Sequence, residues 1–250
     1  EYNDTIRYFE AQLSLLGVEV HRNHQVGFEE LRELYADAVV FATGIHPRMP
    51  DIEGIDHFSV MDYETAITER SIIGNKVAII GAGGIGFDIA EMLATDDESK
   101  DGWYRKWGID TRYQNRGGLL DVDIAQTVDS QHDRTIYLLQ RKPSKPGSNL
   151  ARTTGWIRRL SLRKAGVMML SDVSYEKIDD FGLHIRHHGE ARTLAVDHVI
   201  VCAGQESEDA LFRQLSKIGQ PTHIIGGAKK ASELDAETAI RQGMELAYRL

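Results

Sequence analysis

Residues 76–93 read KVAIIGAGGIGFDIAEML, which is an apolar strand, a glycine-rich turn and a helix with apolar side chains at helical spacing. This order of strand, G-x-G-x-x-G and helix is typical of the turn that holds a dinucleotide pyrophosphate. Gly81 allows a tight turn, Gly83 lets the backbone approach phosphates, and Gly86 lets the helix pack closely on the strand. The stretch therefore predicts a dinucleotide site, with the positive helix N-terminus facing the phosphate charge.

The composition of the chain is that of a globular α/β protein. Its 250 residues are 42% hydrophobic and 27% charged, and the formal net charge is −9 at pH 7. An acidic chain is a poor general nucleic-acid binder, and no run of about 18 apolar residues is present to cross a membrane. We therefore expect a small-molecule nucleotide as the ligand, and neither nucleic acid nor a membrane as a partner.

Cysteine and histidine usage limits the chemistry that this chain can perform by itself. Cys202 is the only cysteine, so the chain has no internal disulfide and fits a reducing cytoplasm, where we expect the protein. A single cysteine cannot hold an iron–sulfur cluster, since such clusters typically need four, and we predict a buried structural thiol. His187 and His188 are adjacent, and neighbouring strand residues point to opposite faces. With no third ligand nearby, we predict no metal site.

Other strands of the chain also end in small residues. Residues 38–44 read AVVFATG, residues 198–205 read HVIVCAGQ, and residues 223–227 read HIIGG before ELDA (233–236) opens a final helix at 237–248. Small residues at strand ends let the chain pass close to a bound dinucleotide. With the glycine motif between them, these strands resemble the flavoproteins with two dinucleotide-binding domains, in which an NAD(P) domain interrupts an FAD domain.

This resemblance implies an α/β fold with two Rossmann-like dinucleotide-binding domains of the FAD/NAD(P) flavoprotein type. Residues 51–205 would form the NADPH-binding domain, with an irregular insertion at about 95–133, and residues 1–50 and 206–250 a partial FAD-binding domain. No glycine motif precedes the helix predicted at 5–16 or the short strand predicted at 18–21. The FAD domain thus lacks its first unit at the N-terminus, and we expect the chain to be the C-terminal part of a longer protein.

The choice of coenzyme is predicted from the strand that follows the glycine motif. Thr135–Leu139 is that strand, and the sequence continues Gln140-Arg141-Lys142-Pro143-Ser144-Lys145. In a Rossmann domain this edge lies beside the adenosine ribose, where an acidic residue selects NAD and an arginine accommodates the 2′-phosphate of NADP. Three cations and no carboxylate favour NADPH over NADH. The alternative is a basic loop that is merely solvated.

Two tryptophan-containing segments each allow a functional and a structural interpretation, and a third segment predicts a simple structural element. Trp156, on a helix predicted within 149–164, could stack on a nicotinamide or flavin ring or belong to the core of an amphipathic helix. Trp103 and Trp107 in the insertion suggest a contact surface that covers the nucleotide cleft or faces another domain, but a packed excursion is equally consistent. Residues 173–177, 183–186 and 193–196 predict a small antiparallel meander, with His187–Glu190 at its turn.

Longer stretches resemble the bacterial-type NADPH-dependent 2,4-dienoyl-CoA reductases over essentially the whole chain. They include KWGID, LLQRKPSKPG, TTGWIRR and SYEKIDDFGLHI. The resemblance implies a module that passes hydride from NADPH to FAD, within an enzyme of unsaturated fatty acid β-oxidation. It also implies that FMN in an N-terminal barrel and a 4Fe–4S cluster, neither held by this chain, carry the electrons onward. We name no catalytic acid or base, because hydride transfer depends mainly on positioning.

The same resemblance leads to a set of predicted cofactor contacts. It implies that Gly81, Gly83, Gly84 and Gly86 face the NADPH pyrophosphate and that Arg141 and Lys142 bind its 2′-phosphate. Further predicted cofactor contacts, not divided between NADPH and FAD, are Ile85, Lys145, Trp156, Ala203, Gly204 and Gln205. FAD contacts are assigned to Val26 at the adenine end and to Ala42, Thr43, Gly44, Gly226, Gly227, Asp235 and Ala236. The chain departs from many of these flavoproteins by having Gly227-Ala228 where they have Gly-Asp, so the resemblance does not extend to their usual carboxylate contact with the ribityl chain.

Two alternatives to this assignment stay open at the level of sequence. The first keeps the enzyme class and changes the substrate, because related barrel-containing flavoproteins include enoate reductases and amine dehydrogenases. The second is a non-catalytic nucleotide-binding fragment, because a flavin site without its own phosphate loop would bind FAD weakly or not at all.

Overall fold

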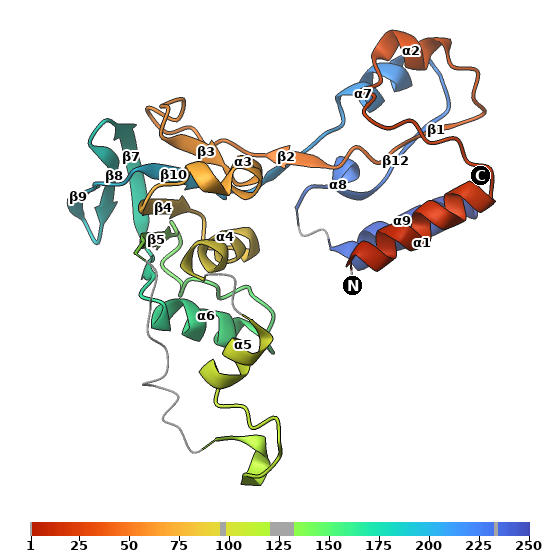
Figure 1. Ribbon diagram of the computed structural model, residues 1–250. Coiled ribbons are helices and arrows are strands. Elements are labelled where there is room, and N and C mark those ends of the chain that lie inside the picture. The colour runs from red at the N-terminus through yellow and green to blue at the C-terminus, as the bar shows by residue number, and fades with distance from the viewer. Residues whose placement is uncertain (1, 96–98, 121–132, 233–234) are drawn as a thin grey trace. The chain divides into compact units, whose positions relative to one another are not determined.

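The computed structural model describes residues 2–95, 99–120, 133–232 and 235–250. The chain forms two compact units, and Figure 1 shows the elements of each. Unit 1 consists of Glu1–Gly44 and Ser207–Leu250, and unit 2 of Ile45–Glu206. Unit 2 is thus inserted into unit 1 along the chain. Which unit binds which nucleotide remains a prediction.

A five-stranded parallel sheet forms the centre of unit 2. Its strands lie in the order β3, β10, β4, β5, β6. The bounds are Val60–Asp62 for β3, His198–Val201 for β10, Lys76–Ile80 for β4, Thr135–Leu139 for β5 and Met168–Leu170 for β6. The strands that the sequence predicts at 76–80, 135–139 and 198–201 are confirmed. Their continuous apolar character is explained by burial of the sheet on both faces.

The two faces of this sheet pack against different layers (Figure 1). Val77 and Ile79 face the helices α3 (Tyr63–Thr68), α4 (Gly84–Ala94) and α6 (Gly155–Lys164). Ala78 and Ile80 alternate with them and face an antiparallel meander. The meander consists of β7 (Val173–Asp179), β8 (Gly182–His187) and β9 (Glu190–Leu194). The meander and its first two strands are confirmed, whereas the third strand begins three residues before the predicted range 193–196 and ends two residues before its end.

The remaining elements of unit 2 are short. A two-stranded sheet pairs β2 (Ile45–Pro47) with β11 (Gln205–Ser207), and η1 (Arg70–Ile72) precedes β4. The insertion contains α5 (Lys100–Lys106) and the short helix η2 (Arg116–Gly118), so its described part is not wholly irregular. Residues 96–98 and 121–132 of the insertion lie outside the described residues.

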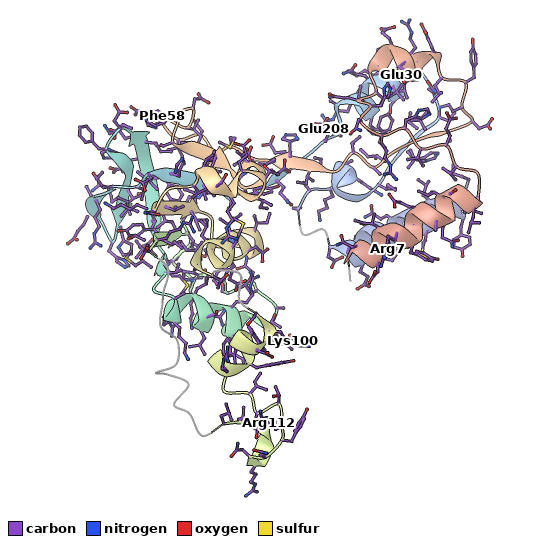
Figure 2. The ribbon with its side chains drawn as sticks, viewed as in Figure 1. Arg7, Glu30, Phe58, Lys100, Arg112 and Glu208 are labelled. Atoms are coloured by element: carbon purple, nitrogen blue, oxygen red, sulfur yellow. The ribbon has the colours of Figure 1, made fainter. Side chains whose placement is uncertain are left out.

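The turn that follows α5 is organised by Asp110, whose side chain is buried. Figure 2 labels Lys100, the first residue of α5, and Arg112 of this turn. One carboxylate oxygen accepts the Arg112 backbone N–H at 2.9 Å. The other accepts the backbone N–H of Asn115 at 2.7 Å and its side-chain Nδ2 at 2.9 Å. These bonds hold the pKa of Asp110 below its usual value, with the Asn115 backbone N–H as the largest cause. The last residue of the KWGID stretch is therefore a structural carboxylate.

Unit 1 has a small core around two parallel strands. β1 (Val39–Phe41) pairs with β12 (Thr222–Ile224), and α2 (Phe28–Glu33) and α7 (Ala210–Lys217) cover them. Leu31, Phe41 and Leu215 form the buried cluster. The unit is completed by α1 (Tyr2–Leu15), α8 (Gly226–Lys229) and α9 (Ala236–Ala247).

The predicted N-terminal and C-terminal helices of unit 1 are confirmed as α1 and α9, with bounds shifted by a few residues. Gly17, at φ +68°, ends α1, and the Val18 N–H donates to the Leu13 carbonyl at 2.9 Å. The strand predicted at Val18–His21 is wrong. Those residues belong to no helix or strand and have no partner strand among the residues that the structure describes.

Candidate nucleotide-binding site

The predicted NADPH residues of unit 2 lie at one edge of its parallel sheet. The register pairs Ile80 of β4 with Leu139 of β5 on one side and with Val201 of β10 on the other. The glycine turn, the basic loop and the turn at 202–205 therefore all begin at the carboxyl edge. The chain order reverses at β4, whose two neighbours are β5 and β10. In open α/β sheets, nucleotides bind at such a switch point.

The glycines of the turn after β4 fall into two pairs. Gly81 has φ +114°, and its Cβ, if present, would lie 2.2 Å from the Cys202 carbonyl oxygen. A Cβ at Gly86 would lie 1.8 Å from the Gly81 carbonyl oxygen. At Gly83 and Gly84, by contrast, no heavy atom other than those of the adjacent chain and the helix backbone lies within 4 Å of the Cβ position. Two glycines thus permit packing, and the other two leave open space at the backbone.

The first turn of α4 offers donors to that space. Gly83 is the N-cap and has no side chain with which to cap the helix. Within the described ranges, no hydrogen bond reaches the backbone N–H groups of residues 83–86, while the Phe87 N–H begins the helical ladder by donating to the Gly83 carbonyl. Free N–H groups at the positive end of a helix bind anions. The open backbone and the free donors together fit a pyrophosphate.

The loop after β5 presents unpaired positive charge. Arg141, Lys142 and Lys145 are exposed, and in the part of the chain that the structure describes none of them has a carboxylate within ion-pair distance. Burial raises the pKa of Tyr175 far above its ordinary value, and the charge of nearby Arg141 acts in the opposite direction. This loop lies one strand away from the glycine turn, as the 2′-phosphate prediction requires.

Trp156 lies in the first turn of α6, and its side chain is 56% exposed. The interpretation as a core tryptophan is therefore wrong. The helix itself begins at Gly155, later than the predicted segment, because Thr153 and Thr154 form a turn before it.

Two arginines of α6, which sequence reasoning did not single out, hold this helix in place. Arg158 Nε donates to Glu91 of α4 at 3.0 Å, and its Nη2 pairs with Asp88. Arg159 Nη1 donates to the Gly147 carbonyl at 2.8 Å. The helix α6, which bears the exposed Trp156, is thus bonded to α4 through Arg158 and to the end of the basic loop through Arg159.

The third segment at this edge, Ala203-Gly204-Gln205, is held by Arg48. Arg48 Nε donates to the Ala203 carbonyl at 3.0 Å, and the Arg48 backbone N–H donates to the Gly204 carbonyl at 3.1 Å. Gly204 has φ +115°, a conformation that favours glycine. Gln205 Nε2 donates to the Tyr63 hydroxyl at 3.3 Å, so its amide already has a partner within the protein. The sequence contained no indication of the Arg48 contact, because it joins residues far apart in the chain.

The predicted FAD residues lie in unit 1, and most gather at one edge. The Ile225 N–H donates to the Phe41 carbonyl at 3.0 Å, so the segments 42–44 and 226–227 leave the β1–β12 pair side by side. At Gly44 and Gly226, both with positive φ, a Cβ would meet nothing within 4 Å. Open backbone at these two glycines fits a close approach of a cofactor. Val26 instead packs partly buried against the core cluster of this unit.

Some donors at this edge already have partners. The Gly226 N–H donates to Gln242 Oε1 of α9 at 2.8 Å, a contact that sequence reasoning missed. Asp235 caps α9 by accepting the Thr238 N–H at 2.8 Å, and this bond lowers the pKa of Asp235. Ala236 begins the helix, and Glu233 and Leu234 lie outside the described residues. Ala228, at the position where the resemblance would imply a carboxylate, is buried.

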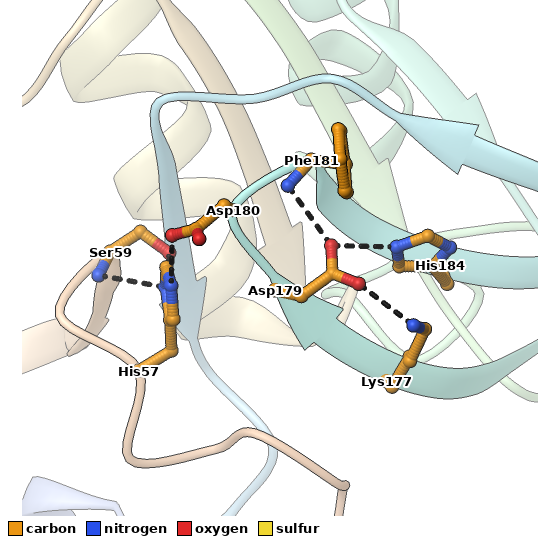
Figure 3. A network of polar contacts seen from close by, with 7 residues as sticks. All are labelled: His57, Ser59, Lys177, Asp179, Asp180, Phe181 and His184. Atoms are coloured by element: carbon orange, nitrogen blue, oxygen red, sulfur yellow. Dashed lines mark hydrogen bonds and ion pairs between the residues drawn. The ribbon is translucent and has the colours of Figure 1, made fainter.

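Figure 3 shows a polar network in unit 2 whose residue types are those of a catalytic site. It lies away from the carboxyl edge of the sheet, where the predicted nucleotide site is. His57 Nδ1 lies 2.8 Å from Ser59 Oγ, and its Nε2 lies 3.2 Å from Asp180. Asp179 contacts Lys177 Nζ and His184 Nε2, both at 2.8 Å, and its pKa is strongly lowered, first by Lys177. Ser59 is buried and precedes β3, at the amino edge of the sheet. The network ties this loop to the β7–β8 turn.

Cys202 is buried, and the paired histidines lie at the β8–β9 turn. Cys202 is 8% exposed, as predicted, and burial raises the pKa of its thiol to about 12. His187 and His188 do not point to opposite faces. His188 has φ +51° in the turn, and the two ring centroids lie 4.0 Å apart. Among the described residues, no group of three or more potential ligands could hold a metal ion, and no helix has the length and apolar character to cross a membrane.

Comparisons with known proteins agree with this geometry. Residues 10–229 match the pyridine nucleotide-disulphide oxidoreductase family. Cinnamate reductase of Clostridium sporogenes is 27% identical over 230 residues, which are 92% of this chain and 29% of that protein. Metal reductase of Desulforamulus reducens is 23% identical over 232 residues, 86% of this chain and 32% of that protein. The chain spans about a third of the length of these curated relatives.

Solved structures show the same fold. 2-Naphthoyl-CoA reductase superimposes with a TM-score of 0.77 at 22% identity, over 100% of this chain and 32% of its own. Histamine dehydrogenase from Rhizobium sp. 4-9 superimposes with a TM-score of 0.69 at 16% identity, over 98% of this chain and 35% of its own. At these identities the likeness establishes the fold alone, and it confirms the predicted FAD/NAD(P) flavoprotein class.

Proposed function

The chain belongs to the pyridine nucleotide-disulphide oxidoreductase family, and we propose that it is the module of a flavoprotein reductase that accepts hydride from NADPH and delivers it to FAD. Family membership supports an oxidoreductase that binds FAD and NAD(P)H; the preference for NADPH is our own proposal. The observation that carries it is the pairing of an open glycine turn after β4 with an unpaired basic loop after β5.

The residues of unit 2 divide the work of binding. The N–H groups at 83–86 bind the pyrophosphate, and Arg141, Lys142 and Lys145 bind the 2′-phosphate. Arg48 holds the turn at 203–205 in place beside them. When bound, the nicotinamide supplies a hydride and the flavin N5 accepts it. The protein contributes orientation, since such a transfer needs an approach of about 3–3.5 Å. Cys202, with a pKa of about 12, stays protonated and takes no part.

The substrate of the whole enzyme is a finer proposal. We propose a 2,4-dienoyl-CoA reductase of unsaturated fatty acid β-oxidation, in the cytoplasm, whose N-terminal FMN barrel and 4Fe–4S region receive the electrons. The stretches KWGID, LLQRKPSKPG and TTGWIRR support it. Similarity to cinnamate reductase and membership of the oxidoreductase family support a reductase, and the enoate reductase and amine dehydrogenase alternatives stay open.

Anaerobic flavin reduction tests the proposed hydride transfer. The purified chain is supplied with FAD and mixed with NADPH or NADH while the flavin absorbance is followed. We expect bleaching that is much faster with NADPH at equal concentration, and none when the nucleotide is omitted. A chain that binds NADPH but retains no FAD would favour the non-catalytic fragment instead. Bleaching at equal rates with both coenzymes would contradict the NADPH assignment.

A further inference from the structure

Gln140 is a buried amide at the base of an exposed basic loop. Its side chain is 9% exposed, whereas residues 141–145 are all exposed. Nε2 donates to the Lys142 carbonyl at 3.0 Å, to the Ser144 carbonyl, and to Ser144 Oγ at 3.2 Å. Because carbonyl oxygens only accept, these partners also fix which end of the amide is the nitrogen. One side chain thus holds the backbone two and four residues ahead of it.

The main chain of Gln140 is itself fixed to the neighbouring strand. Its N–H donates to the Leu170 carbonyl at 2.9 Å, and its carbonyl accepts the Val173 N–H at 3.1 Å. The Lys142 carbonyl accepts a second bond, from the Asp172 N–H at 3.1 Å. The backbone of the loop is therefore anchored, while among the described residues no hydrogen bond or ion pair holds the charged ends of Arg141, Lys142 or Lys145.

These bonds have an electrostatic consequence for an anion. Carbonyl oxygens carry partial negative charge and repel a phosphate, so a loop suits phosphate binding only when its carbonyls turn elsewhere. The buried amide takes up two of them. Because the amide has two hydrogens, one of them is shared between the Ser144 carbonyl and Ser144 Oγ, and the Ser144 hydroxyl keeps its own hydrogen to donate. Ordering the loop before binding also reduces the conformational entropy that a ligand would otherwise have to overcome.

We propose that Gln140 is a positioning residue for 2′-phosphate recognition, which sets the backbone from Lys142 to Ser144 so that the cations and the Ser144 hydroxyl are ready for a phosphomonoester. The inference rests on the proposed use of NADPH and deepens it. Gln140 touches no ligand itself and acts through the loop. Substitution of a purely structural residue would weaken the binding of every ligand of the domain equally, whereas substitution of Gln140 should weaken only the binding of ligands with a 2′-phosphate.

Calorimetric titration of the 250-residue chain tests this with adenosine 2′,5′-bisphosphate and 5′-AMP as probes. Gln140→Met keeps the side-chain volume and removes the donor. We expect about tenfold weaker binding of the bisphosphate and a change of less than about twofold for 5′-AMP. Ser144→Ala, on the exposed loop where folding is not at risk, should give a smaller loss of the same selectivity. Gln220→Met, which removes an amide bond to the Leu34 carbonyl in unit 1, is the matched control.

A combined variant separates positioning from direct contact. In a chain that already carries Arg141→Ala, Lys142→Ala and Ser144→Ala, Gln140→Met should change the ratio of the two affinities by less than about twofold, because its effect passes through those residues. Equal losses of affinity for both probes, or an unchanged ratio of the two affinities in Gln140→Met and Ser144→Ala, would overturn the inference about Gln140 but leave the NADPH assignment intact. A wild-type chain that binds both probes equally would overturn the NADPH assignment, and this inference with it.

Discussion

Gly86 approaches Gly81 so closely that a Cβ atom on it would lie 1.8 Å from the Gly81 carbonyl oxygen. The helix α4 therefore depends on a glycine where it leaves the strand β4. Gly83 and Gly84, two and three residues after Gly81, have open space instead. Substitutions within this one turn can therefore test packing and ligand binding separately, because Gly81 and Gly86 serve packing and Gly83 and Gly84 leave space for a ligand.

Gly86→Ala should destabilise the fold, and Gly83→Ala should impair binding alone. The added methyl of Gly86→Ala meets backbone that cannot move away, and we expect a loss of about 3 kcal/mol in the free energy of unfolding. Gly83 has φ −88°, which alanine adopts freely, so Gly83→Ala should keep its Tm while binding NADPH at least about tenfold more weakly. Urea denaturation and calorimetric titration of both variants provide the two measurements.

The opposite pattern would contradict this separation. If Gly83→Ala bound NADPH as the wild type does, the open space at residue 83 would not be the phosphate site. If Gly86→Ala were as stable as the wild type, the close contact with Gly81 would not be a feature of the protein in solution.

Removing the cations of the basic loop should affect NADPH selectively. Arg141→Ala with Lys142→Ala removes two charged donors to a phosphomonoester, and we expect binding of NADPH to weaken by about 10- to 100-fold. Binding of NADH should stay within about twofold. Arg213→Ala with Lys217→Ala on α7 of unit 1 controls for the loss of net positive charge. Equal losses for both coenzymes would exclude the 2′-phosphate assignment.

The thiol of Cys202 should resist alkylation in the folded protein. Burial raises its pKa to about 12, so the reactive thiolate is strongly disfavoured at pH 8, and the side chain is 8% exposed. Iodoacetamide should modify the native chain at least about a hundredfold more slowly than the urea-unfolded chain. Because Cys202 is the only cysteine, mass spectrometry of the intact chain measures both rates. Similar rates would show that the strand end is open.

The turn that Asp110 organises should open in acid. Its pKa is lower in the folded than in the unfolded chain, so its contribution to stability is present above about pH 4 and is lost as the pH falls through the folded pKa. Hydrogen exchange of residues 110–119 should therefore accelerate below about pH 4 beyond its intrinsic pH dependence. Asp110→Asn should show the faster exchange already at neutral pH, and Asp101→Asn in the same insertion should not.

Local sequence patterns predicted the parts of the fold that local physics determines. The apolar run at 76–80 with its glycine turn, the three strands of the meander and the helices α1 and α9 all follow from periodicity and turn residues. The alternating residues at 18–21 also satisfied a strand pattern, but a strand exists only where another supplies hydrogen bonds, and the sequence does not reveal its partner.

Residues that act through long-range contacts were the ones the sequence could not predict. Arg48 reaches the turn at 203–205, and Arg158 reaches α4, across separations that no spacing rule covers. Gln140 was visible as the end of a strand, but its role depends on where the Lys142 and Ser144 carbonyls point. The positions of the glycines were predicted, whereas their division into packed and open pairs required the structure.

Titration of the purified chain with NADPH and with NADH, followed by calorimetry, tests the central claim most directly. The open turn at 83–86 and the unpaired cations at 141–145 predict a single site that binds NADPH at least about tenfold more tightly than NADH. Equal affinity for the two coenzymes, or no binding of either, would contradict the assignment of unit 2 as a phosphate-selective entry point for electrons.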